Sequence, residues 1–398
     1  MNSDFFNVID KLRVKLLAFP AAEPSVYDKY KKKYISLFNP EQVEFVNNNP
    51  EVLMFLSGGA ERSAIESVQE YRFYLVLASK NDNSWAAATE TVAWMSQHNI
   101  STMLVNAESP EAPILLSEYY KAVTGVKRLH GQRLGVVGSS SEWLVASAVS
   151  PFQLQSKMGI EQVDIAWSDI VFDEVAQVSS DFMALFGNTG DKKELFESGK
   201  VYEGLASLIP FYKLNSLSVE CFPMVNKTSH TACLALAKLN YDGIPAACEA
   251  DNTSAAGMMF ASEVCGFSPW MANTIFVEAE KAVFAHCTVP MNLVSDFKLD
   301  THFETNKGLA VAGNIKGEVV TIFRFNNTFT KMFIAEADVF SRPQKRVACR
   351  TQLEVKITPS ATKYFLEYPF GNHHLILPGK FAQRLKLAAK LLQMEVVE

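Results

Sequence analysis

The sequence predicts an α/β protein in which two Rossmann-like αβα layers precede a β-rich, barrel-like C-terminal domain with a terminal helix. Two observations support this fold class. Up to about residue 265, short apolar runs alternate with segments of helical period, as in parallel sheets covered by helices. Beyond that point, strand-like segments follow one another across short turns until FAQRLKLAAKLLQM, which has a helical pattern.

The alternation is clearest in the first third of the chain. The apolar runs RVKLLAFPA, PEVLMFLSGG, YRFYLVLAS and ISTMLVNA predict strands, and the segments between them predict helices. A second αβ unit begins at QRLGVVG, whose glycines end a strand, and a serine of the following SSSEWLVASAV is suited to cap a helix. At roughly 150 residues per domain, the chain fits three domains: 1–130, 131–265 and 266–398.

Charge and cysteine content disfavour several classes of protein. The 37 Lys and Arg against 43 Asp and Glu give a net charge of −6, which disfavours binding to nucleic acid or to an acidic membrane surface. None of the six cysteines forms a CxxC pair, so neither a disulfide framework nor a zinc site is indicated. The N-terminus lacks the order of a signal peptide, and no apolar stretch approaches about 18 residues, so we expect a cytoplasmic protein without a membrane segment.

Four polar clusters interrupt the apolar strand pattern and are the candidate sites. The first is AACEADNTSAAGM, residues 246–258, where Glu249 ends a strand and Asp251 lies two residues further on. Two carboxylates at the carboxyl end of a strand, just before a helix, occupy the position where α/β proteins bind ligands. A structural interpretation has equal weight: Asp251 caps the helix, and Glu249 pairs with a neighbouring cation.

Two further clusters place an imidazole beside a second polar side chain. In FAHCTVP, His286 and Thr288 share one face of a strand, and a buried structural histidine is the commoner explanation for that pattern. In LDTHFETNKG, His302 and Glu304 project together from an extended chain, as do a metal ligand and its partner or the members of a proton relay. An exposed loop produces the same spacing.

The fourth cluster is FGNHHLILPG. His373 and His374 point to opposite faces of an extended segment, so at most one of them enters a given site. Adjacent histidines that follow Gly371 and Asn372 are unusual in a core strand, which favours a functional role.

The remaining side chains indicate a metal and a substrate class. Arg350 and Gln352 of CRTQ share a strand face and suit hydrogen bonding to hydroxyls or a carboxylate, with a surface ion pair as the structural alternative. One or two carboxylates with one imidazole, and no thiolates at zinc-finger spacing, suit Mn²⁺ or Mg²⁺ with open coordination positions. An open-sited ion beside hydroxyl-binding side chains indicates a polyol or sugar substrate.

In this order and spacing, the clusters resemble the L-fucose isomerase-like family, which includes L-fucose/D-arabinose isomerases and, more distantly, L-arabinose isomerase. The strings that carry the resemblance are GVVGSSSEWLVAS, VECFPMV, TACLALAKLNYDGIPAACEADNTSA, AHCTVP, THFETNKG, CRTQ and GNHH. The resemblance implies metal-dependent interconversion of an aldose and a ketose through an enediol. It also implies active sites formed between the subunits of a homo-trimer or homo-hexamer.

The resemblance further implies roles for individual residues. The implied ligands of Mn²⁺, or of another divalent cation, are Glu249, Asn273 and His374, with His373 as the alternative imidazole. By the resemblance Glu249 also acts as a base, and Asp251 and Glu304 are the other predicted catalytic residues. The predicted substrate-binding residues come from the polar clusters themselves: His286, His302, Arg350, Gln352, Asn372 and His373.

The chain departs from the family at two positions. Asn273 stands where the family has a second acidic ligand, and Ala250 stands where the family has a glycine. An amide binds a metal weakly and accepts no proton at neutral pH, so Asp251 or Glu304 would have to supply the base. Three functions therefore stay open: an active isomerase, a non-catalytic sugar-binding or regulatory relative, and a metal-dependent lyase or epimerase.

Overall fold

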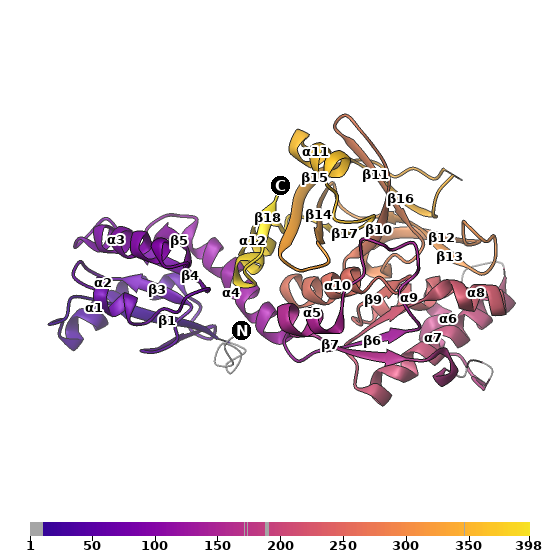
Figure 1. Cartoon of the computed structure of the whole chain (residues 1–398), viewed down its shortest axis with the longest axis horizontal. Helices are drawn as coiled ribbons and strands as arrows, with labels where there is room; N and C mark the ends of the chain where they lie inside the picture. The colour runs from indigo at the N-terminus through magenta and orange to yellow at the C-terminus, as the bar shows by residue number, and fades with distance from the viewer. Residues whose placement is uncertain (1–10, 171, 173, 188–190, 346) are drawn as a thin grey trace. The chain divides into compact units, whose positions relative to one another are not determined.

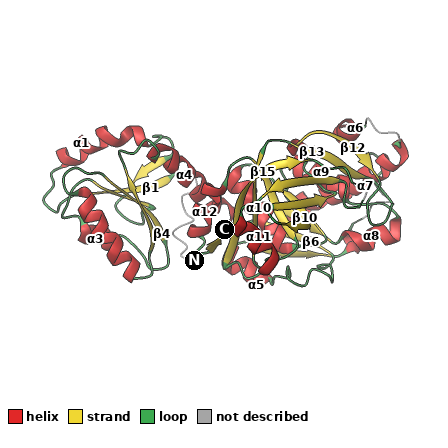
Figure 2. Cartoon of the chain, turned by 90° about the horizontal axis from the view of Figure 1, so that it is seen from above, coloured by secondary structure: helices red, strands yellow, loops and turns green. Residues whose placement is uncertain are grey.

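The computed structural model describes residues 11–170, 172, 174–187, 191–345 and 347–398. The chain forms two compact units. The first unit comprises Met1–Arg128 and Gln383–Met394, and the second comprises Leu129–Ala382 and Glu395–Glu398. Figure 1 traces the elements of both units along the chain, and Figure 2 shows them by type.

The first unit is built on a five-stranded sheet in which every pairing is parallel, with strand order β2-β1-β3-β4-β5. The strands are β1 (Leu12–Leu17), β2 (Val43–Phe45), β3 (Val52–Phe55), β4 (Phe73–Ala78) and β5 (Ser101–Asn106). Every residue of β3 and β4 is buried, as expected of central parallel strands covered on both faces. The helices are α1 (Pro24–Tyr34), η2 (Ile35–Leu37), α2 (Glu61–Ile65), α3 (Ser84–Gln97), α4 (Ala112–Leu129) and α12 (Ala382–Leu391).

Helix α12 joins the first unit from the far end of the sequence. The guanidinium of Arg384 donates hydrogen bonds to both carboxylate oxygens of Glu118 on α4, at 2.7 and 2.8 Å. The ammonium group of Lys390 lies 5.5 Å from the ring centroid of Phe73. The terminal helix therefore packs against elements from the beginning of the chain, whereas the sequence assigned it to the 266–398 domain.

The second unit contains a four-stranded parallel sheet with strand order β7-β6-β8-β9. Its strands are β6 (Arg133–Val137), β7 (Glu161–Ile165), β8 (Ser216–Val219) and β9 (Ala246–Cys248). The accompanying helices are α5 (Pro151–Gln153), η3 (Leu154–Met158), η4 (Trp167–Asp169), α6 (Ser180–Phe186), α7 (Lys192–Tyr212), α8 (Cys221–Thr228), α9 (Cys233–Tyr241) and α10 (Asn252–Cys265). The helix predicted at SSSEWLVASAV is wrong, because residues 139–149 form a series of turns between β6 and α5.

A larger mixed sheet completes the second unit, with strand order β14-β17-β10-β11-β16-β15-β18. Its strands are β10 (Trp270–Glu278), β11 (Lys281–His286), β14 (Val319–Phe325), β15 (Lys331–Ser341), β16 (Thr351–Lys356), β17 (His373–Pro378) and β18 (Glu395–Val397). An additional pairing of β14 with β15 joins the antiparallel strands into a closed ring. The remaining elements are η5 (Met291–Leu293), the hairpin strands β12 (Val294–Asp300) and β13 (Ala310–Ile315), and α11 (Pro359–Glu367).

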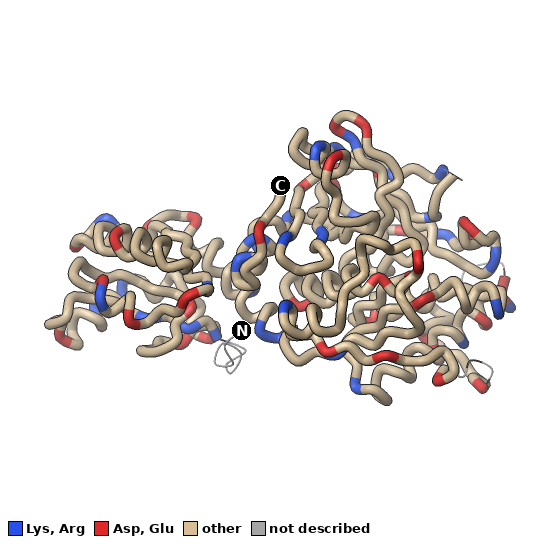
Figure 3. The backbone as a smooth tube through the Cα atoms, in the orientation of Figure 1, with Lys and Arg blue, Asp and Glu red and all other residues tan. Residues whose placement is uncertain are grey.

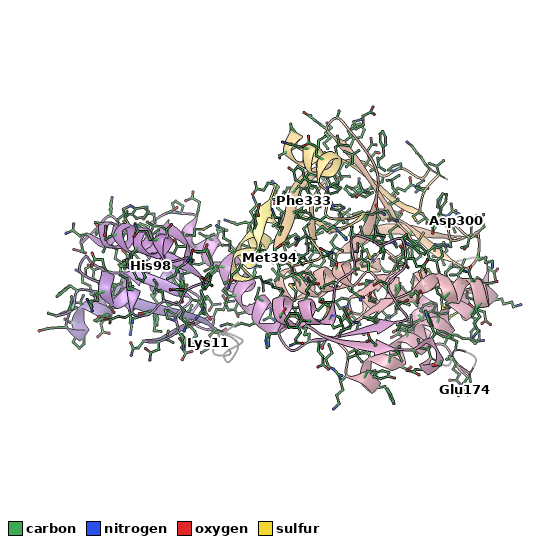
Figure 4. All side chains as sticks on the ribbon, viewed as in Figure 1. Lys11, His98, Glu174, Asp300, Phe333 and Met394 are labelled. Atoms are coloured by element: carbon green, nitrogen blue, oxygen red, sulfur yellow. The ribbon has the colours of Figure 1, made fainter. Side chains whose placement is uncertain are left out.

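One apolar core joins helices that accompany the parallel sheet to the mixed sheet. It combines side chains from α6, α7 and α9 with inward-facing residues of the mixed sheet, including Trp270, Phe284 and Ile376. Phe333 of β15, labelled in Figure 4, stacks on Tyr364 of α11 with ring centroids 3.7 Å apart. This shared core explains why residues 131–265 and 266–382 form one unit, where the sequence predicts two domains.

Helix α10 contacts β8 and β9 of the parallel sheet and β14 and β17 of the mixed sheet. Gly257 on this helix permits a close approach, because a Cβ there would lie 2.4 Å from Cδ1 of Leu375 on β17. The helix therefore brings the carboxyl end of β9 toward the first residues of β17. The predicted α/β class with parallel sheets is confirmed.

Acidic and basic positions are interspersed along both units (Figure 3). Among the described residues, none of the helices combines the length and the apolar character needed to cross a lipid bilayer.

Candidate metal centre

Three side chains from separate elements of the second unit converge on one point. Glu249 follows β9, His286 ends β11 and His373 begins β17. The ends of β11 and β17 flank β10 on either side, where Asn273 lies opposite both His373 and Ala285, the neighbour of His286. One ligand atom of each of Glu249, His286 and His373 lies within 4.8 Å of the others.

The free nitrogens of both imidazoles face one carboxylate oxygen. Nε2 of His373 lies 3.6 Å from Oε1 of Glu249, and Nε2 of His286 lies 3.9 Å from the same oxygen. Both Nε2 atoms are buried and have no hydrogen-bond partner. A buried polar atom without a partner is costly, so two of them facing one carboxylate fit a site that completes its contacts with a cation.

The other nitrogen of each imidazole is held by a neighbouring side chain. Nδ1 of His373 lies 2.9 Å from Oδ2 of Asp251, and Nδ1 of His286 lies 3.0 Å from the hydroxyl of Thr288. Metal-binding histidines generally use their second nitrogen in this way, which fixes the orientation of the ring. The two rings lie 5.5 Å apart between centroids.

Asp251 is fully buried and contacts Ser254, His373 and Arg324. Its Oδ1 accepts a hydrogen bond from the backbone N–H of Ser254 at 2.8 Å and so caps α10, and its Oδ2 lies 3.6 Å from Nη1 of Arg324. Burial would raise the pKa of Asp251, but the Arg324 guanidinium and His373 hold it well below its usual range. The structural interpretation of Asp251 as a helix cap is therefore confirmed.

Arg324 is itself buried and ties several segments together. It donates hydrogen bonds to the carbonyl oxygen of His373, to Oγ of Ser254 at 3.2 Å and to Oγ of Ser147 at 2.6 Å. Arg324 was not among the predicted site residues. The only indication in the sequence was that a single arginine interrupts the apolar strand VVTIFRF.

The three candidate ligands carry different charges in the metal-free protein. Burial would raise the pKa of Glu249, but its interaction with His373 and the nearby His286 lower it to about 2. Burial would lower the pKa of His373, but Asp251 and Glu249 raise it to about 9. Burial and the neighbouring His373 cation lower the pKa of His286 to about 4. At neutral pH, Glu249 is therefore an anion, His373 a cation and His286 neutral.

The backbone at Glu249 is strained. Glu249 has φ of 59° and Ala250 has φ of 48°, so two consecutive residues with side chains adopt the left-handed region. Such a conformation costs of order 1–3 kcal/mol per residue and persists where the surroundings enforce it. The loop after β6 does so, because Ser141 N–H donates to Glu249 O at 3.1 Å and the Ser140 hydroxyl donates to Ala250 O at 2.8 Å.

The same loop contributes Trp143, which was also not among the predicted site residues. Its indole N–H donates to Oε2 of Glu249 at 2.6 Å. The two oxygens of this carboxylate are thereby distinguished: Oε2 accepts from Trp143, and Oε1 faces the two imidazoles.

The structure places His374 outside this cluster. Its Nε2 lies 3.1 Å from the Tyr364 hydroxyl, and its Nδ1 lies 3.0 Å from the Thr274 hydroxyl and 3.1 Å from the carbonyl oxygen of Asn372. Neighbouring residues of a strand point to opposite faces, so only one of the two histidines reaches Glu249. That histidine is His373, which corrects the assignment of His374 as the metal ligand.

The amide of Asn273 faces another amide. Its Oδ1 accepts a hydrogen bond from Nδ2 of Asn372 at 2.5 Å, and this pair joins β10 to the residue that precedes β17. Asn273 and Asn372, predicted as a metal ligand and a substrate-binding residue, therefore make a structural contact with each other.

His302 and Glu304 form a separate pair near the cluster. Nε2 of His302 lies 3.3 Å from Oε2 of Glu304, and its Nδ1 lies 3.0 Å from the Thr305 hydroxyl. Burial raises the pKa of Glu304, the imidazole of His302 opposes this, and the charge of Glu249 raises it further. The charge of Glu249 is thus close enough to affect Glu304. The pKa of Glu304 is raised, whereas that of Glu249 is lowered.

Arg350 and Gln352 hold loops of the protein. Arg350 donates hydrogen bonds to the carbonyl oxygen of Thr301 at 2.6 Å and to its hydroxyl at 3.2 Å. The amide nitrogen of Gln352 donates to the carbonyl oxygens of Lys345 at 2.6 Å and Cys349 at 3.0 Å. Both predicted substrate-binding side chains therefore make structural contacts, and Arg350 positions the start of the loop that carries His302 and Glu304.

A comparison with models of known protein families finds no match, and a search of the curated proteins finds none. Function is accordingly inferred from the geometry of the cluster. Two imidazole nitrogens and one carboxylate oxygen form a donor set that suits a borderline divalent ion such as Mn²⁺, Fe²⁺, Co²⁺ or Zn²⁺.

Proposed function

We propose that the protein is a divalent-metal-dependent sugar isomerase that interconverts an aldose and a ketose, with Glu249, His286 and His373 as the metal ligands. The observation that supports this most is the pair of buried, unpartnered Nε2 atoms facing one carboxylate oxygen. When bound, a divalent ion supplies Lewis-acid polarisation of the sugar's carbonyl oxygen. His286 replaces Asn273 as the third ligand, so the departure from the family at residue 273 does not prevent metal binding.

Glu304 is our candidate for moving the proton between C1 and C2. A carboxylate with the low pKa of Glu249 is a weak base, whereas the raised pKa of Glu304 brings it closer to working pH. His302 contacts Glu304 directly and orients it. Asp251 is assigned a positioning role, because its oxygens are engaged by Ser254, His373 and Arg324.

Several broader features belong to the same proposal. The two parallel sheets and the closed ring of antiparallel strands support a fold of two Rossmann-like layers followed by a barrel-like domain, as in L-fucose isomerase-like proteins. We also propose a cytoplasmic homo-trimer or homo-hexamer that acts on an unphosphorylated sugar. Light scattering of the purified protein tests the assembly, and a strict monomer would contradict this part.

The catalytic proposal is tested with matched carboxylate-to-amide variants. We expect the wild-type protein to bind Mn²⁺ in calorimetry and to convert at least one of a panel of pentoses, hexoses and deoxyhexoses to its ketose. Glu249→Gln should lose both metal binding and turnover, whereas Glu304→Gln should keep the metal and lose about a hundredfold in kcat. Glu367→Gln, an exposed change on α11, is the control and should behave as wild type.

Other outcomes would assign a different function. Thermal stabilisation by a sugar without turnover would indicate the non-catalytic sugar-binding or regulatory relative. Cleaved or epimerised products would indicate a lyase or epimerase. A wild-type protein that binds Mn²⁺ and converts no sugar would contradict the isomerase.

A further inference from the structure

Trp143 combines an exposed ring with a hydrogen bond to a mostly buried carboxylate. The residue is 55% exposed, yet its N–H donates at 2.6 Å to the carboxylate of Glu249, whose side chain is only 12% exposed. We propose that Trp143 is both the positioning residue for Glu249 and the aromatic platform on which the C–H face of a neutral sugar packs. This inference rests on the proposed function and adds to it how the ligand carboxylate is oriented and what binds the sugar.

The positioning role follows from the two oxygens of Glu249. Rotation about the last bond of the side chain turns the plane of the carboxylate, and both imidazoles have their contact with the same oxygen, Oε1. The indole N–H holds Oε2, which leaves Oε1 directed at the two Nε2 atoms. Hydrogen bonds that orient a ligand in this way contribute about 10- to 100-fold to metal affinity in other sites.

The loop that carries Trp143 is itself anchored at the site. Backbone and hydroxyl groups of Ser140 and Ser141 bind the carbonyl oxygens of Glu249 and Ala250, and the carbonyl oxygen of Ser147 accepts from the Thr253 hydroxyl at 2.8 Å. These contacts lie on both sides of Trp143. Its ring is therefore held in place beside the metal centre although it faces solvent.

The platform role follows from the rings around Trp143. The indole meets the ring of Phe222 edge to face at 5.0 Å, and Phe222 meets the imidazole of His302 at 5.9 Å. A row of rings thus leads from Glu249 to the His302–Glu304 pair. Since the N–H of Trp143 is already used by Glu249, the exposed part of the indole offers an apolar surface. Such a surface suits the C–H groups of an uncharged sugar whose oxygens are directed at the metal and at Glu304.

Two substitutions separate the two roles. Trp143→Phe keeps a flat ring and removes the N–H donor, whereas Trp143→Ala removes both. Trp85→Phe is the matched control, because Trp85 is 41% exposed and lies on α3 of the first unit. Thermal melts of all three variants check that the fold is retained.

Metal binding is measured first and does not require turnover. We expect Trp143→Phe to weaken the Kd for Mn²⁺ by about tenfold in calorimetry, with Trp85→Phe unchanged. We expect Trp143→Ala to lose a similar factor in metal affinity and, in addition, to raise KM for the converted sugar by about tenfold, while Trp143→Phe keeps KM within about threefold. Linear pentitols (ribitol, arabinitol and xylitol) should change the indole fluorescence of the wild type and of Trp85→Phe, but not that of Trp143→Phe.

The failure of this inference is distinct from the failure of the proposed function. If the wild type binds no Mn²⁺ and converts no sugar, the proposed function falls and the inference falls with it. If the wild type is active and Trp143→Phe binds Mn²⁺ as tightly as Trp85→Phe, the positioning role is wrong. If Trp143→Ala keeps the wild-type KM, the platform role is wrong.

Discussion

At the scale of single residues, the three proposed ligands differ in how firmly each holds a proton. His373 is protonated at neutral pH, because Asp251 and Glu249 raise its pKa to about 9. His286 is neutral, and Glu249 is ionised. A metal ion therefore competes with one proton, and that proton is on His373.

This competition predicts the pH dependence of metal binding. The Kd for Mn²⁺ should improve about tenfold per pH unit between pH 7 and 9 and level off above that, since one bound proton is displaced. Calorimetry in buffers of different ionisation enthalpy should count about one proton released per metal at pH 7. Without metal, the raised pKa stabilises the fold below the unfolded value of about 6.5, and this contribution is lost as pH rises through about 9. A Kd that stays constant from pH 7 to 9 would contradict the assignment of His373 as a ligand.

Residue identities in the site were predictable in part. Glu249 and His286 were visible because each interrupts an apolar strand pattern, and the alternation of side chains showed that only one of His373 and His374 enters the site. Which of the two does so depends on the register between β17 and β10, which is a long-range pairing. Trp143 and Arg324 reach the site from distant segments, so local pattern could not assign them a role.

At the scale of elements, the turn between β9 and α10 sets the position of Glu249. The apolar run before Glu249 predicted the strand, and the following small residues predicted the helix. The sharp turn between them was not predictable, since Glu249 and Ala250 adopt positive φ without the glycine that usually marks such a turn. The helix expected after β6 did not form, because Ser140 and Ser141 hold that turn in place.

The close approach of α10 to β17 gives a prediction about stability. Gly257→Ala should lower the free energy of unfolding by about 1–2 kcal/mol, because the new Cβ meets the buried side chain of Leu375. Alanine is otherwise the better helix former by about 1 kcal/mol. Whether the substitution lowers or raises the free energy of unfolding therefore tests the contact.

The partner of that contact provides the control. In a Leu375→Val background, which shortens the side chain, Gly257→Ala should cost less than half as much in urea denaturation. Equal costs in both backgrounds would show that the two residues do not meet.

At the scale of the whole molecule, the chain passes between the two units three times, after residues 128, 382 and 394. The division near residue 130 was visible as the start of a new αβ pattern. The return of α12 to the first unit was not, because the sequence shows an amphipathic helix without showing which surface receives it.

Two truncations test the return of α12. Deletion of residues 395–398 removes only β18, which pairs with β15 of the second unit, and should leave the first unit intact. Deletion of residues 383–398 also removes the partner of Glu118 and should make the first unit sensitive to limited proteolysis by trypsin. Equal resistance of residues 11–128 in the two truncated proteins would show that α12 contributes nothing to the first unit.

The late position of α12 in the sequence also has a consequence for synthesis. Domains near the N-terminus usually fold first as the chain leaves the ribosome. Here the surface that receives α12 stays uncovered until residues 382–391 have been made, long after the rest of the first unit, which ends at Arg128. The first unit therefore completes its fold only after the intervening residues 129–382 of the second unit have been made.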